Sequence, residues 1–289
     1  MVPNVRIIIL NYNGQALLPE CLPSIVEAAQ KSRFKTGVTV LDNVSIDSGL
    51  DYVRSHFPAV HIEKAPANKI LCSYNDYLPS VLEPVVILLN NDIRVDSDFV
   101  DSLVQKFVDD PQTFLAAPRV MSFDGSRIEA AKTKAGMRFG IFHSDARYPG
   151  YEKDAMMSSE TFSSGFGAFS REKFLQLNGY DPRYAPGIYE DVDLCYRAQK
   201  AGYHLYYEPQ STVYHMGQAS FSKAFGKNRI SVIAHRNGFL FMWKNFTGFW
   251  FWLTHLFFLP FRLLYAILRG NFSFVRGFFE ALNHTPSAK

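Results

Sequence analysis

Three carboxylates stand within four residues of the chain, in the segment Glu190-Asp191-Val192-Asp193. This segment follows Pro186 and Gly187 and precedes a helical pattern, which predicts that a helix begins at about Glu190. Acids in the first turn of a helix are stabilised by free N–H groups and by the helix dipole. A carboxylate kept ionised in this place can accept a proton as a general base.

A structural interpretation of the same cluster is also open, because Asp and Glu are enriched in first turns for capping alone. Asp193 and Arg197 are spaced i, i+4 and can pair on the helix surface, which suits a structural role. Glu190 and Asp191 therefore remain as the candidates for chemistry. The apolar residues that the helix should turn inward are Leu194, Ala198 and Ala201.

The first half of the chain alternates short apolar runs with a helical pattern. Strands are expected over Val5–Leu10, Val38–Leu41 and Val85–Leu89. A helix after the first strand should bury one face, formed by Leu18, Cys21, Leu22, Ile25 and Val26. This order predicts an α/β fold with a mostly parallel, Rossmann-like sheet covered by helices on both faces. Such sheets bind ligands at the carboxyl ends of their strands.

All three expected strands end in polar residues, which predicts a nucleotide site if the ends converge. The alternative is that these residues only form turns. Asp92 also offers the hard oxygen ligand that a divalent cation requires, although an Asp beside two Asn residues is also typical of a turn. Neither a G-x-G-x-x-G motif after the first strand nor a P-loop occurs. The candidate nucleotide-binding residues at the strand ends are Asn11, Asn13, Asp42, Asn43, Asp47 and Asn91.

The composition is that of a globular protein. With 289 residues and 47% hydrophobic content, the chain is long enough for one large domain and an appendage. Its three cysteines, Cys21, Cys72 and Cys195, are widely spaced and indicate neither a disulfide framework nor a Cys-based zinc site, so a reducing, cytoplasmic environment is expected. The short apolar run before Asn11 does not resemble the core of a signal peptide.

The C-terminal quarter differs in charge from the rest. Residues 217–289 hold nine Lys and Arg residues and one acidic residue. Residues 1–216 hold twenty-one Lys and Arg residues and twenty-six Asp and Glu residues. Basic residues interleaved with Phe and Trp favour an anionic membrane surface. The apolar stretch Gly248–Phe261 is shorter than the roughly 20 residues that span a bilayer. Pro260 and Gly270 should break its helix into short amphipathic pieces lying in the interface. A core-packing helical subdomain and an oligomer interface are the alternatives.

The ordered motifs from Val5 to about Ser220 resemble those of the family 2 glycosyltransferases, which have a GT-A fold, and especially the rhamnosyltransferase-like branch of cell-surface polysaccharide synthesis. The resemblance rests on the Asn11-Tyr12-Asn13 strand end, the Asp42-Asn43-x-Ser45-x-Asp47 loop, the Asn90-Asn91-Asp92 exit and the long block Ser164–Tyr207 with His215 beyond it. It implies a transferase domain over residues 1–220 and a membrane-associating helical region over 221–289.

The resemblance also implies roles for single residues. Asp42 would contact the pyrimidine base of the donor, and Asp191 would deprotonate the acceptor hydroxyl. Asp92 would be the last acid of the metal-binding element, and His215 would contact the metal ion or the diphosphate. Asn68 and Asn75, in a stretch where relatives usually show a glycine-rich loop, would belong to the donor site. The D-x-D element of the family reads Asn90-Asn91-Asp92 here, with an amide in place of one carboxylate.

The implied activity is inverting, non-processive transfer of one sugar from a UDP- or dTDP-sugar, with Mg²⁺ or Mn²⁺, to a lipid-linked or glycan acceptor at the inner face of the cell membrane. Processive relatives usually carry a Gln-x-x-Arg-Trp element, which is absent. An inactive scaffold of a polysaccharide-synthesis complex is the alternative. A nucleotidyltransferase is disfavoured because the glycine-rich opening is missing. The basic segment is too apolar for nucleic acid. The oligomeric state stays open.

Overall fold

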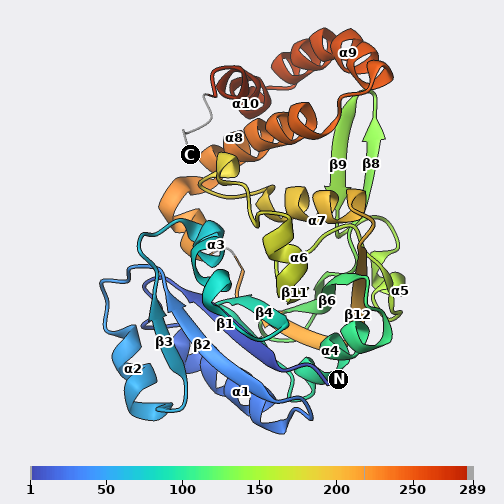
Figure 1. Cartoon of the computed structure of the whole chain (residues 1–289). Helices are drawn as coiled ribbons and strands as arrows, with labels where there is room; N and C mark the ends of the chain where they lie inside the picture. Colours follow the sequence, from blue (N-terminus) through green and yellow to red (C-terminus); the bar gives the residue numbers. More distant parts are fainter. Residues whose placement is uncertain (1, 218, 285–289) are drawn as a thin grey trace.

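The computed structural model describes residues 2–217 and 219–284, and a ten-stranded mixed sheet forms its centre (Figure 1). The strand order along the main path is β10-β12-β6-β11-β4-β1-β2-β3, with β5 paired to β12 and β7 to β6. Strands β4, β1, β2 and β3 run parallel, whereas β11 is antiparallel to β4 and to β6. The predicted α/β class with a mostly parallel sheet is therefore confirmed.

The strands of this sheet are β1 (Val5–Asn11), β2 (Thr36–Asp42), β3 (His61–Lys64), β4 (Val85–Asn90), β5 (Ile93–Val95), β6 (Thr113–Ser122), β7 (Ile128–Ala130), β10 (Ser159–Glu160), β11 (Gly167–Ser170) and β12 (His204–His215). A separate hairpin comprises β8 (Lys134–Arg138) and β9 (Ile141–Asp145). The helices are α1 (Leu18–Lys31), α2 (Gly49–His56), α3 (Ser73–Tyr77), α4 (Phe99–Asp109), α5 (Tyr151–Asp154), α6 (Arg171–Gln176), α7 (Glu190–Lys200), α8 (Ala219–Asn245), α9 (Phe249–Leu268) and α10 (Phe272–Leu282).

Helices cover both faces of the sheet, because alternate side chains of each buried strand point to opposite faces. Ile7 and Ile9 of β1 join a core with residues of α1 and α4. Ile8 and Leu10 join a second core with residues of α3, α6 and α7. The acid-bearing helix α7 is therefore fixed to the sheet from one side.

The register of the parallel strands brings the polar strand ends together. Asn11 at the end of β1 is paired with Asp42 at the end of β2, and Leu10 is paired with Asn90 at the end of β4. The predicted convergence of the three strand ends at one edge of the sheet is confirmed.

The C-terminal helices lie beyond this edge (Figure 1). α8 contains a non-helical residue, Gly226, at φ 70° and ψ 153°. Phe239 and Phe241 of α8 share a core with Tyr184, Val192 and residues of α10. The division of the chain at residue 220 stays a prediction, but the second half of α8 packs directly against α7.

Helix α9 corrects one sequence prediction: it continues through Pro260, and only Gly270, at φ 69°, follows its end. Contacts on both sides of Pro260 hold the helix against the turn of the β8–β9 hairpin. His255 Nδ1 lies 2.6 Å from the carbonyl oxygen of Gly140, and Arg262 Nη2 donates to the carbonyl of Arg138 at 2.7 Å. These anchors offset the hydrogen bond that proline cannot make. They also turn the His255 and Arg262 side chains toward the hairpin.

The opposite face of α9 is exposed and apolar. Within the described residues, α9 is the helix whose length and composition would let it cross a membrane, and 17% of its most apolar window is buried. It therefore does not pack as a core helix of this chain. The residues of this face, called here the apolar face of α9, are Phe249, Trp250, Leu253, Leu256, Phe257, Phe261, Leu264 and Tyr265.

Replacing Gly140 with Ala should detach α9 from the hairpin. Gly140 has φ +70°, and a Cβ there would lie 2.6 Å from the Cα of His255. We expect the free energy of unfolding to fall by about 1–3 kcal/mol or more, from overpacking and the left-handed backbone. Denaturant unfolding measures this. Gly150→Ala is the matched control, because Gly150 has φ +86° and its Cβ would meet no atom within 4 Å. Equal losses in both variants would contradict the clash with α9.

Candidate active site

Helix α7 begins at Glu190, as the sequence predicts. The two residues before it, Ile188 and Tyr189, have φ values of 72° and 85°, a conformation unfavourable for side chains branched at Cβ such as Ile. The inward face includes Leu194 and Ala198, which are fully buried. The prediction for Ala201 was wrong: the helix ends at Lys200, so Ala201 is its exposed C-cap.

The Glu190 and Asp191 carboxyl groups form a tightly coupled pair. Glu190 is 7% exposed and its Oε2 has no hydrogen-bond partner. Burial, and then the charge of Asp191, raise the pKa of Glu190 to about 8. Burial also raises the pKa of Asp191, although hydrogen bonds from backbone N–H groups at the helix start lower it in part. A pair with raised pKa values is suited to taking up a proton near neutral pH.

Asp193 pairs with Arg197 as its spacing predicts, but its side chain is fully buried and does not lie on the helix surface. Its carboxylate accepts from Arg197 Nε at 2.7 Å, Tyr184 Oη at 2.9 Å, Lys244 Nζ at 2.8 Å and Asn245 Nδ2 at 2.9 Å. Burial alone would raise the pKa of Asp193, but the charges of Arg197 and Lys244 lower it. The saturated carboxylate leaves no lone pair directed at a substrate.

The strand ends are linked by the buried side chain of Asn11. Its Oδ1 accepts from Asn91 Nδ2 at 2.9 Å, and its Nδ2 donates to Asp42 Oδ1 at 3.3 Å. Asp42 is 1% exposed and also accepts from the backbone N–H of Ser45. The three strand exits thus form one hydrogen-bonded unit.

Several other candidate residues shape the loops around this unit. Asn13 Oδ1 accepts from the backbone of Ile46, and Asp47 accepts from the backbone N–H groups of Gln15 and Gly49.

A second group of candidates ties the loop before α3 to its neighbours. Asn43 Nδ2 donates to Asn68 Oδ1 at 2.9 Å. The amide of Asn75 makes two bonds to the backbone of Tyr180, at 2.7 and 2.9 Å. These bonds describe positioning of the loops, and direct contact of Asn68 and Asn75 with a donor stays a prediction.

Asp92, two residues after the end of β4, meets His215. His215 is the last residue of β12 and lies beyond the Ser164–Tyr207 block. His215 Nε2 lies 3.4 Å from Asp92 Oδ2, and its Nδ1 lies 3.9 Å from Glu129. Burial alone would lower the pKa of His215, but Asp92 and then Glu129 raise it.

The Asp92–His215 pair fits a divalent cation shared with a substrate. In residues 2–217 and 219–284 no group of three or more His, Cys, Asp and Glu side chains is arranged to hold a metal ion. However, Asp92 Oδ1 is buried and has no hydrogen-bond partner. A carboxylate and an imidazole suit a cation whose remaining ligands come from a diphosphate and water.

A short loop before β11 joins this pair to the acid pair. A Cβ on Gly165 would lie 3.3 Å from Asp191 Oδ2, so Asp191 faces this loop. The ring of the next residue, Phe166, lies 6.0 Å from the imidazole of His215. Asp191 and the Asp92–His215 pair therefore flank the same loop.

Asn237 of α8 was not predicted from the sequence. It is fully buried, and its Nδ2 donates to the carbonyls of Tyr184, Gly187 and Ile188 at 2.7–2.8 Å. It holds the loop that ends at Glu190, including one of the residues with positive φ. The only available signal was the short polar segment His235–Asn237 between the apolar runs Val232–Ala234 and Phe239–Phe241.

The sequence model of the glycosyltransferase-like family 2 matches residues 3–230. The chain belongs to this family. As a family 2 glycosyltransferase it transfers a sugar from a nucleotide donor. A relative from Mycobacterium tuberculosis, N-acetylglucosaminyl-diphospho-decaprenol L-rhamnosyltransferase, is 24% identical over 276 residues, covering 86% of this chain and 87% of the relative.

Solved structures identify the fold of the transferase as GT-A. The mannosyltransferase PcManGT from Pyrobaculum calidifontis, in complex with GDP-Man and Mn²⁺, superposes with a TM-score of 0.60 at 15% identity, over 100% of this chain and 77% of the other. GalNAc-T7 with UDP, GalNAc and Mn²⁺ gives a TM-score of 0.59 at 16% identity over 74% of this chain. This chain spans 43% of the GalNAc-T7 chain.

The pH profile of the transferase should depend on Glu190. Because burial raises the pKa of Asp191, kcat/KM of the wild type should decline as the pH falls through this raised pKa and the base becomes protonated. Glu190→Gln removes the like charge beside Asp191, so the pKa of Asp191 falls and this limb moves to lower pH. Initial rates across the pH range measure the shift. Glu172→Gln, at an exposed position of α6, is the control for unspecific effects. If the acid limb of the pH profile does not move in Glu190→Gln, Glu190 does not influence the pKa of Asp191.

Proposed function

We propose that the protein is an inverting, metal-dependent, non-processive glycosyltransferase that adds one sugar from a nucleoside diphosphate donor to a lipid-linked or glycan acceptor. The observation that carries the proposal is the Gly165–Phe166 loop, flanked by Asp191 on one side and by the Asp92–His215 pair on the other. A single displacement needs a base near the acceptor and positive charge near the leaving group.

In the proposed reaction Asp191 takes the proton of the acceptor hydroxyl while that oxygen forms a bond to the anomeric carbon. The bond from the anomeric carbon to the diphosphate oxygen breaks, and the nucleoside diphosphate leaves with the electron pair. Asp92 and His215 would hold Mg²⁺ or Mn²⁺, which when bound supplies positive charge to the leaving diphosphate. Glu190 modulates the pKa of the base, and Asp193 fixes the helix that carries it.

The donor would lie over the linked strand ends. Asp42 is proposed to contact a pyrimidine base, which favours UDP- or dTDP-sugars, with Asn11, Asn43 and Asn91 shaping the floor of the site. Asn13, Asp47, Asn68 and Asn75 complete the proposed donor region through the loops that they hold.

The proposed place of reaction is the cytoplasmic surface of the cell membrane, in the synthesis of a cell-surface polysaccharide. The exposed apolar face of α9 and the excess of basic residues in the C-terminal quarter support association with an anionic lipid surface. The lipid-linked acceptor named for the mycobacterial relative and the rhamnose it transfers agree with this proposal. Sedimentation with anionic liposomes tests it: a protein that stays soluble without detergent and fails to pellet with them would exclude membrane association.

A panel of UDP-, dTDP- and GDP-sugars, each with and without Mg²⁺ or Mn²⁺, tests donor, metal and activity together. We expect binding of one nucleotide class and cation-dependent release of its nucleoside diphosphate. Release that is independent of any cation would contradict the role given to Asp92 and His215.

One observation favours the alternative of an inactive scaffold: Asn90 stands where the D-x-D element of the family has its first carboxylate, which leaves Asp92 as the single acid of this element. The scaffold predicts that a nucleotide sugar binds without transfer and without donor hydrolysis. The buried Glu190–Asp191 pair supports catalysis, because acids whose pKa values are shifted by burial cluster at functional sites.

A further inference from the structure

Two adjoining cavities lie between α8 and α10, outside the site described above. The larger, of about 720 Å³, is lined by Lys227 and Arg229 of α8 and by Arg276 of α10. The smaller, of about 390 Å³, is lined by Arg236 of α8 and again by Arg276. Because Arg276 borders both cavities, we treat them as one feature, the α8–α10 groove.

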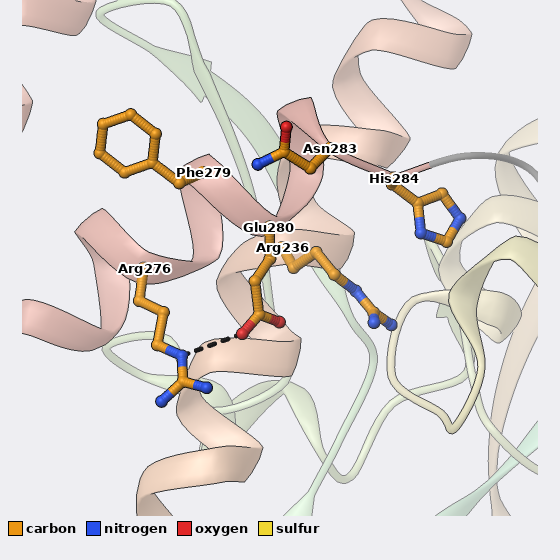
Figure 2. A pocket seen from close by; sticks show the side chains of 6 residues that line it. All are labelled: Arg236, Arg276, Phe279, Glu280, Asn283 and His284. Atoms are coloured by element: carbon orange, nitrogen blue, oxygen red, sulfur yellow. Dashed lines mark hydrogen bonds and ion pairs between the residues drawn. The ribbon is translucent and has the colours of Figure 1, made fainter.

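The α8–α10 groove has an excess of positive charge. Its carboxylate is that of Glu280, which pairs with Arg229 Nη1 at 2.6 Å and with Arg276 Nε at 3.0 Å. In Figure 2 this carboxylate lies between the guanidinium groups of Arg276 and Arg236. Burial, and then the charge of Arg229, lower the pKa of Arg236. Four cationic side chains and one carboxylate give the groove a net positive charge, which a bound anion would neutralise.

The groove is connected to the acid pair through its own wall. Arg236 Nη2 donates to the carbonyl of Ala185, and the neighbouring Asn237 donates to the carbonyl of Ile188, two residues before Glu190. A group bound in the groove is therefore held against the segment that positions the proposed base.

The outer side of the groove borders an apolar surface. Phe272, which lines the larger cavity, is 67% exposed, and Phe279, which lines the smaller one, is 54% exposed. The apolar face of α9 precedes α10 in the chain. An anion bound in the groove thus has an exposed apolar surface on one side and the segment that precedes Glu190 on the other.

We propose that the α8–α10 groove binds the diphosphate of a lipid-linked acceptor, with the lipid chain on the apolar surface of α9 and α10. This inference rests on the proposed function. Guanidinium groups bind phosphate oxygens through paired hydrogen bonds, and a diphosphate presents more oxygens and more charge than a single phosphodiester. A convergent set of four cations in one groove suits a diphosphate better than the dispersed headgroups of bulk phospholipid.

The test is binding of the full-length protein to neutral phosphatidylcholine vesicles that contain either a long-chain isoprenyl diphosphate or phosphatidylglycerol at equal charge. The wild type should prefer the diphosphate vesicles. The double variant Lys227→Ala, Arg276→Gln should lose about tenfold or more in affinity for them, as expected for the loss of charge-assisted hydrogen bonds. The double variant Lys227→Ala, Arg276→Lys should recover part of this loss, because lysine keeps the positive charge at position 276.

The matched control is Arg269→Gln, which removes one exposed positive charge after α9 that borders neither cavity. An equal loss in this control, or an equal loss towards both kinds of vesicle, would overturn the proposal in favour of a general electrostatic effect. Binding needs no sugar donor, so this measurement can succeed or fail independently of transferase activity. In transfer assays the double variant should raise the KM of the acceptor and leave the KM of the donor at the wild-type value.

Discussion

Replacing Asp191 with Asn should lower kcat for sugar transfer by about 10²–10⁴-fold, the range for loss of a general base. The amide has nearly the same shape as the carboxylate but does not accept the proton of the acceptor hydroxyl. Since Asp191 is not among the residues proposed to bind the donor, the affinity for the nucleotide sugar should be retained. Initial-rate kinetics and equilibrium titration of the donor measure the two quantities separately.

The control for this variant is Asp51→Asn, an exposed acid of the same type in the first turn of α2, which should have wild-type kinetics. Near-normal turnover in Asp191→Asn would contradict the assignment of the base. A loss of donor binding equal to the loss of turnover would instead give Asp191 a role in the donor site.

Replacing Asp92 with Asn should lower kcat/KM by about 10²-fold or more and shift the cation dependence of the reaction to higher Mg²⁺ or Mn²⁺ concentrations. A cation at a leaving diphosphate stabilises the transition state by several kcal/mol, and each 1.4 kcal/mol corresponds to about tenfold in rate. The buried, unpartnered Oδ1 of Asp92 is the atom whose negative charge the variant removes. Rates measured against cation concentration give both effects.

Asp98→Asn serves as the matched control, since Asp98 is exposed and its side chain makes no capping hydrogen bond at the start of α4. If Asp92→Asn keeps the cation dependence of the wild type, Asp92 is not a metal ligand. An intact Tm in the variant is needed for this comparison, because Asp92 also faces His215.

Local patterns in the sequence predicted much of the site. The start of α7 at Glu190 and the Asp193–Arg197 pair follow from residues within one or two helical turns. The convergence of the strand ends follows from the geometry of parallel strands.

Contacts between distant segments were not predictable in the same way. Lys244 and Asn245 reach Asp193 from more than 50 residues away, and Glu129 approaches His215 because β7 pairs with β6. The periodicity of the sequence does not predict such contacts between distant segments. The break of α9 at Pro260 was predicted from a local rule, which the bonds of His255 and Arg262 to the hairpin override.

The most direct test of the account is proton NMR of one reaction mixture that contains the wild-type protein, its donor from the nucleotide-sugar panel, a divalent cation and a lipid-linked acceptor. The account predicts that one sugar is added per acceptor, that its anomeric configuration is inverted relative to the donor, and that one nucleoside diphosphate is released for each sugar. Retention of configuration, or a bound donor that is neither transferred nor hydrolysed, would contradict it.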